Sequence, residues 1–183
     1  MKISDMKKSL LLTLAMLITT VTTTTVTACP FDEANVEVTV LAKDEIAKAV
    51  NAGNYAQATA AIKKNKMLYD YFGHGIYTAL LKASANSDGA KINSLLDKTL
   101  YLEVKELLGQ VDKEFSNYQK SRLKLIKAKK HLKALTREKA PTSVMKKILK
   151  TLGNPGLMGV GKRNPDKAAF SSNSNKLLGM IRR

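Results

Sequence analysis

Residues 100–139 read LYLEVKELLGQVDKEFSNYQKSRLKLIKAKKHLKALTREK, a run without proline in which Gly109 is the only glycine. One set of apolar and aromatic residues recurs at a strict seven-residue spacing: Val104, Val111, Tyr118, Leu125 and Leu132. This spacing places them on one face of a helix. The companion positions are apolar only in part: Leu107, Glu114, Ser121, Ala128 and Leu135. A coiled coil needs both positions apolar. The run therefore predicts one long amphipathic helix that packs against the helices preceding it.

The segment before this run also predicts helices. Asp44–Ala52 and Asn54–Lys64 form two short helical patterns that meet at Gly53, with Asp44 as a plausible N-cap. Val36–Leu41 alternates like a strand, and we interpret it as an extended lead-in or as the start of the next helix. Composition agrees, because alanine, lysine and leucine dominate and tryptophan is absent.

A 34-residue repeat would relate these helices to the segment that follows them. The run Gly53-Asn54-Tyr55-Ala56-Gln57-Ala58 resembles the helix-joining turn of tetratricopeptide repeats, and 78–83 resembles the opening of an ankyrin repeat. Four small or aliphatic positions recur 34 residues later, which is the tetratricopeptide period: Ala49, Ala58, Ala61 and Ile62 become Ala83, Ile92, Leu95 and Leu96. The resemblance implies helical hairpins that hold a peptide. The alternative is two ordinary hairpins, since two units are fewer than such arrays need.

Charge divides the chain into two halves. Residues 30–115 carry 10 lysines against 12 acidic residues, whereas residues 116–183 carry 18 lysines and arginines against Glu138 and Asp166 alone. So large an uncompensated charge repels itself, and a polyanionic partner relieves that repulsion. After Tyr118 the only aromatic residue is Phe170, although proteins that bind single-stranded nucleic acid usually stack bases on aromatic side chains. The composition favours anionic headgroups or envelope polymers over nucleic acid.

The last part of the chain predicts a short basic helix and a tail. Val144, Met145, Ile148, Leu149 and Leu152 form an apolar stripe, with three lysines opposite, between Pro141 and Gly153. From Gly153 onward glycine, asparagine, proline and serine prevail, which predicts disorder.

The first residues predict export. Lysines within the first eight residues precede an apolar run, Leu10–Ile18, in which only Thr13 is polar. This is the layout of a secretory signal peptide. As a helix the run spans about 14 Å, much less than a hydrocarbon core of about 30 Å. A threonine-rich tract follows and ends at Cys29, the single cysteine of the chain.

The sequence Val26-Thr27-Ala28-Cys29 resembles the lipobox of bacterial lipoproteins. The resemblance implies that Cys29 becomes the first residue after cleavage and carries a lipid on its thiol. It also implies a membrane-anchored protein of the bacterial cell envelope that faces the periplasm or the exterior. The same residues satisfy the rule for ordinary signal cleavage, which would give a soluble secreted protein. A third alternative is an uncleaved anchor over 10–28, although eight threonines make it a poor spanning helix.

The sequence contains no clear set of catalytic residues or metal ligands. His74 lies between two glycines with no second histidine or cysteine nearby, so we expect no metal site. Gly156–Lys162 resembles a phosphate-binding P-loop, but Arg163 stands where serine or threonine should follow. We expect no enzymatic activity and no cofactor.

We therefore predict an all-α protein with a small helical-hairpin domain, a long basic amphipathic helix and a disordered tail. The predicted segments are a signal peptide (1–28), a lipidated tether (29–42), a helical domain (43–140), and a basic amphipathic helix with the tail (141–183).

The expected function is non-enzymatic docking of the basic half on an anionic surface or an acidic partner. The expected lipid attachment site is Cys29, and the expected binding residues are Lys124, Lys127, Lys129, Lys130, Lys133, Lys146, Lys147 and Lys150. One alternative is an adaptor that binds a protein partner through residues 43–100. Another is a secreted polycation that acts on membranes or nucleic acid.

Overall fold

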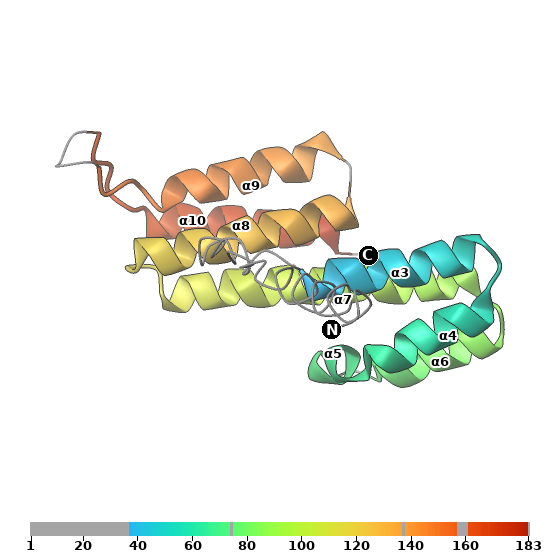
Figure 1. Ribbon diagram of the computed structural model, residues 1–183. Coiled ribbons are helices and arrows are strands. Elements are labelled where there is room, and N and C mark those ends of the chain that lie inside the picture. The colour runs from blue at the N-terminus through green and yellow to red at the C-terminus, as the bar shows by residue number, and fades with distance from the viewer. Residues whose placement is uncertain (1–36, 74, 137, 157–160, 183) are drawn as a thin grey trace, which may run out of the picture. The chain divides into compact units, whose positions relative to one another are not determined.

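The computed structural model describes residues 37–73, 75–136, 138–156 and 161–182. Within them every regular element is a helix, which confirms the all-α class (Figure 1): α3 (Val38–Asn51), α4 (Tyr55–Lys64), α5 (Lys66–Tyr71), α6 (Ile76–Ala85), α7 (Gly89–Lys113), α8 (Tyr118–Leu135), α9 (Lys139–Thr151) and α10 (Lys167–Ile181). The predicted signal peptide and Cys29 lie outside the described residues.

Four helices close into a first bundle. Helix α3 packs on α4, α4 on α6, α6 on α7, and α7 returns to α3. Their inward faces form one hydrophobic cluster, whose largest buried members include Ile46, Ile62, Leu80, Ile92 and Leu96. The short α5 packs on α6 and adds Tyr69 to this cluster.

Helix α7 also belongs to a second bundle. It packs on α8, α8 on α9, α9 on α10, and α10 returns to α7 (Figure 1). A second hydrophobic cluster fills this bundle and includes Leu100, Val104, Leu125, Leu132, Met145, Phe170 and Leu177. The predicted helical domain (43–140) and the segment 141–183 therefore share a hydrophobic core.

The turns α3–α4 and α6–α7 repeat one geometry at an offset of 34 residues. Gly53 and Ser87 both have positive φ, at 68° and 53°. Asn54 and Asp88 follow them, and each side chain caps the next helix by accepting a backbone N–H. Each of these two residues also donates its own N–H to the carbonyl five residues earlier, at 2.9 Å. Two hairpin turns of the same geometry therefore lie 34 residues apart. Because α3 packs on α7, the two hairpins form a closed bundle rather than the open stack of a solenoid.

The start of α3 confirms one interpretation of Val36–Leu41, as the start of the next helix, and corrects two other expectations. The helix begins at Val38, so residues 38–42 are helical and are not part of a tether. Glu37 occupies the N-cap position, and Asp44 lies inside the helix instead of capping it. Burial of Thr39, Ala42 and Ile46 on one face explains the outcome, because helical packing overrides the short alternating pattern.

The single helix predicted over 100–139 is wrong, because the chain reverses between Lys113 and Tyr118. Phe115 is buried in the reversal, and the side chain of Asn117 caps α8 by accepting the N–H of Lys120 at 3.1 Å. The seam residues Val104, Val111, Leu125 and Leu132 all enter the second hydrophobic cluster, from the two helices of this hairpin.

The expectation of a disordered tail is wrong over residues 167–181. Residues 167–181 form α10, which Asp166 caps by accepting the N–H of Ala169 at 2.8 Å. Phe170, Leu177 and Ile181 are buried against α7 and α9. Residues spaced at 170, 174, 177 and 181 share one face of a helix, and their burial stabilises a segment rich in serine and asparagine.

Candidate anionic-surface site

Helix α9 presents a continuous basic face. Lys146, Lys147 and Lys150 are exposed, while Val144, Met145 and Ile148 are buried on the opposite side. The helix ends before Gly153, whose φ of 72° permits the chain to turn back towards α10. A rigid core therefore holds these three lysines on the outer side of the second bundle.

Helix α8, which packs against α9, carries further lysines. Lys133 is exposed, and Lys127 and Lys129 are half-buried. Within the described residues, no carboxylate lies within salt-bridge distance of these three lysines or of the three on α9. Six of the eight predicted binding residues thus have no salt bridge to an acidic group in the described part of the chain.

Two of the predicted residues serve the fold instead. The ammonium group of Lys124 donates to Glu114 at 2.7 Å across the α7–α8 hairpin. This hydrogen bond lowers the pKa of Glu114 below its ordinary value. Lys130 lies 3.8 Å from Glu37 at the start of α3. Acids of the N-terminal half thereby engage part of the excess positive charge.

The apolar stripe of α9 cannot provide a second mode of membrane contact. If exposed, Met145, Ile148 and Leu149 of this stripe could touch a lipid surface after the lysines had bound. The side chains of Met145 and Ile148 are fully buried in the second hydrophobic cluster, and Leu149 packs partly against it. A contact of α9 with a charged surface would therefore be electrostatic.

The basic half offers little for stacking nucleic acid bases. Phe170 is buried, with its ring centroid 5.1 Å from that of Phe115. Tyr118 is half-buried and packs against the same cluster. The described part of the basic half has no exposed aromatic side chain, which favours headgroups over bases.

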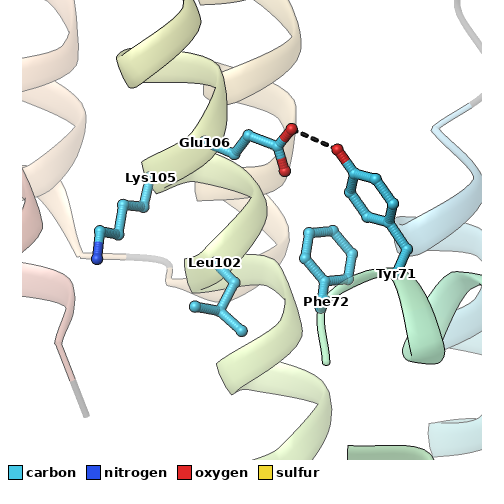
Figure 2. A pocket seen from close by; sticks show the side chains of 5 residues that line it. All are labelled: Tyr71, Phe72, Leu102, Lys105 and Glu106. Carbon is cyan, nitrogen blue, oxygen red and sulfur yellow. Dashed lines mark hydrogen bonds between the residues drawn. The ribbon is translucent and has the colours of Figure 1, made fainter. Parts of the chain in front are cut away.

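The aromatic segment near residue 70 lines an open cleft between α5 and α7. Five residues line this cleft: Tyr71, Phe72, Leu102, Lys105 and Glu106. Figure 2 shows the two aromatic rings on the side of α7 that carries Leu102 and Glu106, whereas Lys105 points away from them. The Tyr71 hydroxyl donates a hydrogen bond to the Glu106 carboxylate. That hydrogen bond raises the pKa of Tyr71 above its ordinary value. Tyr69, by contrast, is buried in the first cluster.

The positions that recur at the 34-residue spacing do not line this cleft. The repeated small and aliphatic positions, such as Ala58, Ile62, Ala83 and Leu96, are buried inside the closed bundle. His74 and residues 157–160 of the P-loop-like segment lie outside the described residues.

A polar cluster that the sequence analysis missed lies where α3, α7 and α8 meet. Nε2 of His131 lies 3.1 Å from Oε2 of Glu37 and 3.3 Å from Oε1 of Glu103. The three residues are too far apart in the chain to form a local motif. The available signal was the position of His131 on the apolar face, three residues after Ala128 and four before Leu135.

Comparison with protein families, curated proteins and solved structures finds no match to this chain. No helix in the described residues is both long and apolar enough to cross a membrane.

Proposed function

We propose that this chain is a non-enzymatic lipoprotein of the bacterial cell envelope whose basic half docks on anionic lipid headgroups. The observation that carries the proposal is the set of lysines on α8 and α9 that have no salt bridge within the described residues. Lys146, Lys147 and Lys150 are its centre, because all three are exposed on one face of one helix.

Electrostatics makes this face suited to a charged surface. Each lysine or arginine close to an anionic membrane contributes about 1 kcal/mol, and the attraction decays within a Debye length of about 8 Å at physiological salt. Because Met145 and Ile148 are buried, apolar insertion adds little to this attraction. Binding should therefore depend on headgroup charge and weaken steeply with salt.

A lipid on Cys29 would bring the basic half close to a membrane. Nine positions separate Cys29 from Val38, the first residue of α3. An extended chain of that length spans about 30 Å. A tether of this length raises the effective concentration of the domain at the surface that it is proposed to bind.

Lipidation is tested by changing Cys29 to serine. We expect the variant to lose acyl labelling and to remain unprocessed by lipoprotein signal peptidase, since the thiol accepts the lipid. A variant that is cleaved and released like the wild type would show that the leader belongs to an ordinary secreted protein.

Docking is tested by co-sedimentation of the fragment 30–183, which contains both hydrophobic clusters, with liposomes of graded anionic content. The key variant is Lys146→Gln/Lys147→Gln/Lys150→Gln. Its matched control is Lys48→Gln/Lys63→Gln/Lys82→Gln, which removes the same charge from exposed positions of the first bundle. Glutamine is a good helix former, so neither variant should lose helix content.

We expect binding to anionic liposomes at about 0.1 M salt and release at about 1 M, where the Debye length falls to about 3 Å. Equal binding to neutral and anionic liposomes would refute the proposal. Salt-sensitive binding to DNA without binding to liposomes would favour the secreted polycation instead.

A further inference from the structure

The cluster at the start of α3 joins three ligand-type side chains from three helices. Glu37 is the N-cap residue of α3, Glu103 lies in α7, and His131 lies in α8. The side chain of His131 is 0% exposed, and those of Glu37 and Glu103 are 10% and 23% exposed. One ligand atom from each residue lies within 4.8 Å of the other two.

Hydrogen bonding does not account for this cluster. Within the described residues, neither ring nitrogen of His131 has a hydrogen-bond partner, although two carboxylate oxygens lie 3.1 Å and 3.3 Å from Nε2. Oε2 of Glu103 is likewise buried without a hydrogen bond among these residues, and Oε1 of Glu37 has only the ion pair with Lys130 at 3.8 Å, which is too long for a hydrogen bond. Buried polar atoms of this kind are normally satisfied, and each that is not costs about 1–3 kcal/mol.

We propose that Glu37, Glu103 and His131 bind a divalent transition-metal ion, with Zn²⁺ as the preferred ion. Zinc binds imidazole nitrogen and carboxylate oxygen at about 2.0–2.2 Å in tetrahedral geometry. Two ligand atoms at that distance from a tetrahedral ion lie about 3.4 Å apart. The separations of 3.1 Å and 3.3 Å around Nε2 are close to this value.

The donor set selects the class of ion. Two carboxylates supply two negative charges for a divalent ion, and the ion would share the Glu37 carboxylate with the Lys130 ammonium group at 3.8 Å. Calcium and magnesium prefer sites built wholly of oxygen, whereas imidazole suits zinc, copper, iron and nickel. Three protein ligands leave a fourth tetrahedral position for water.

A metal ion here would fasten the first turn of α3 to the α7–α8 hairpin. Both hydrophobic clusters form from residues outside this triad, so the ion would add stability to a fold that does not need it. The site is independent of the lysines on α9, and either proposal can fail without the other.

Binding is tested with Zn²⁺ and Co²⁺ on the full chain, purified in a mild detergent. Every protein in the series carries Cys29→Ser, so that the thiol cannot act as a ligand. The variants are Glu103→Gln and His131→Gln. The control is His74→Gln, which removes the only other histidine of the chain. The readouts are calorimetric titration with Zn²⁺, visible absorption of bound Co²⁺, and the thermal melting temperature.

We expect one Zn²⁺ per chain, a four-coordinate Co²⁺ spectrum, and a rise in melting temperature of about 5–10 °C when Zn²⁺ is about 100 times its Kd. Both site variants should lose more than about 100-fold in affinity, because outer-shell changes alone cost 10–100-fold. Glu103→Gln is nearly isosteric and partly exposed, so it should remain folded even if His131→Gln does not. Absence of saturable binding, or equal binding by Glu103→Gln and His74→Gln, would overturn the proposal.

Discussion

Lys43 offers the sharpest test of how the helices are held together. Its ammonium group lies 2.6 Å from Oδ1 of Asp97 on α7 and 2.7 Å from the carbonyl oxygen of Ala134 near the end of α8. One side chain of α3 thus joins the two helices of the hairpin. The side chains of Lys43 and Asp97 are 17% and 24% exposed, so water screens this ion pair only in part.

We expect Lys43→Met to lower the free energy of unfolding by about 2 kcal/mol. Methionine keeps the unbranched stem and removes both charge-assisted hydrogen bonds, each of which contributes about 1.5–3 kcal/mol when well shielded. Partial exposure of Asp97 reduces the total, because water can solvate the carboxylate that is left. For a domain of this size the expected fall in melting temperature is about 4–8 °C.

The matched control is Lys64→Met, which breaks the pair between Lys64 and Glu45 at 3.2 Å. Those side chains are 68% and 42% exposed, so the loss should stay below about 1 kcal/mol. The assay is urea unfolding followed by circular dichroism, with Asp97→Asn and the double variant completing a cycle. Equal losses of stability in Lys43→Met and the control would contradict this prediction, as would simple additivity of the effects of Lys43→Met and Asp97→Asn.

Two further predictions concern a turn and an ion pair. Gly153→Ala should lower the free energy of unfolding by more than about 2 kcal/mol, because φ is 72° and a Cβ would lie 2.4 Å from the Arg163 carbonyl oxygen. The control is Gly53→Ala, where φ is 68° but the space around the Cβ is open, so in the same unfolding assay the loss should be about 1–2 kcal/mol. The lowered pKa of Glu114 means that its pair with Lys124 stabilises the fold above about pH 4.5, and that this contribution is lost as the pH falls through the lower pKa of the folded state. Glu114→Gln should therefore lose less stability on acidification than the wild type. Parallel curves of stability against pH for the two proteins would contradict this prediction.

Local pattern was enough to predict the helices but not all of their ends. The seven-residue spacing over 100–139 predicted the buried face correctly, because Val104, Val111, Leu125 and Leu132 are all buried. It could not show that the chain reverses near Phe115, since one long helix and a hairpin bury the same residues. The decisive contacts are made across the hairpin, and a single-helix pattern does not contain them.

Helix α10 was missed for a similar reason. Residues 167–181 are rich in serine and asparagine, and a helix of this composition is marginal in isolation. Packing of Phe170, Leu177 and Ile181 against α7 and α9 supplies the stabilisation that local propensity lacks. Asp166 caps this helix, but a capping residue alone does not predict a packed helix.

The candidate site was predictable only in part. Charge counting identified the lysines of α8 and α9, but not that Lys124 and Lys130 pair with acids from the preceding half. The cluster around His131 depends on the meeting of three helices, and no spacing rule connects Glu37 to Glu103.

The most direct test of the proposed docking is the ratio of two affinities for anionic liposomes at about 0.1 M salt. Lys146→Gln/Lys147→Gln/Lys150→Gln should bind roughly 100-fold more weakly than the wild type, because three contacts of about 1 kcal/mol each are lost. Lys48→Gln/Lys63→Gln/Lys82→Gln should stay within about threefold, since those lysines lie in the first bundle, away from α9. Equal losses in the two variants would show that net charge alone drives binding, and would contradict a docking face on α9.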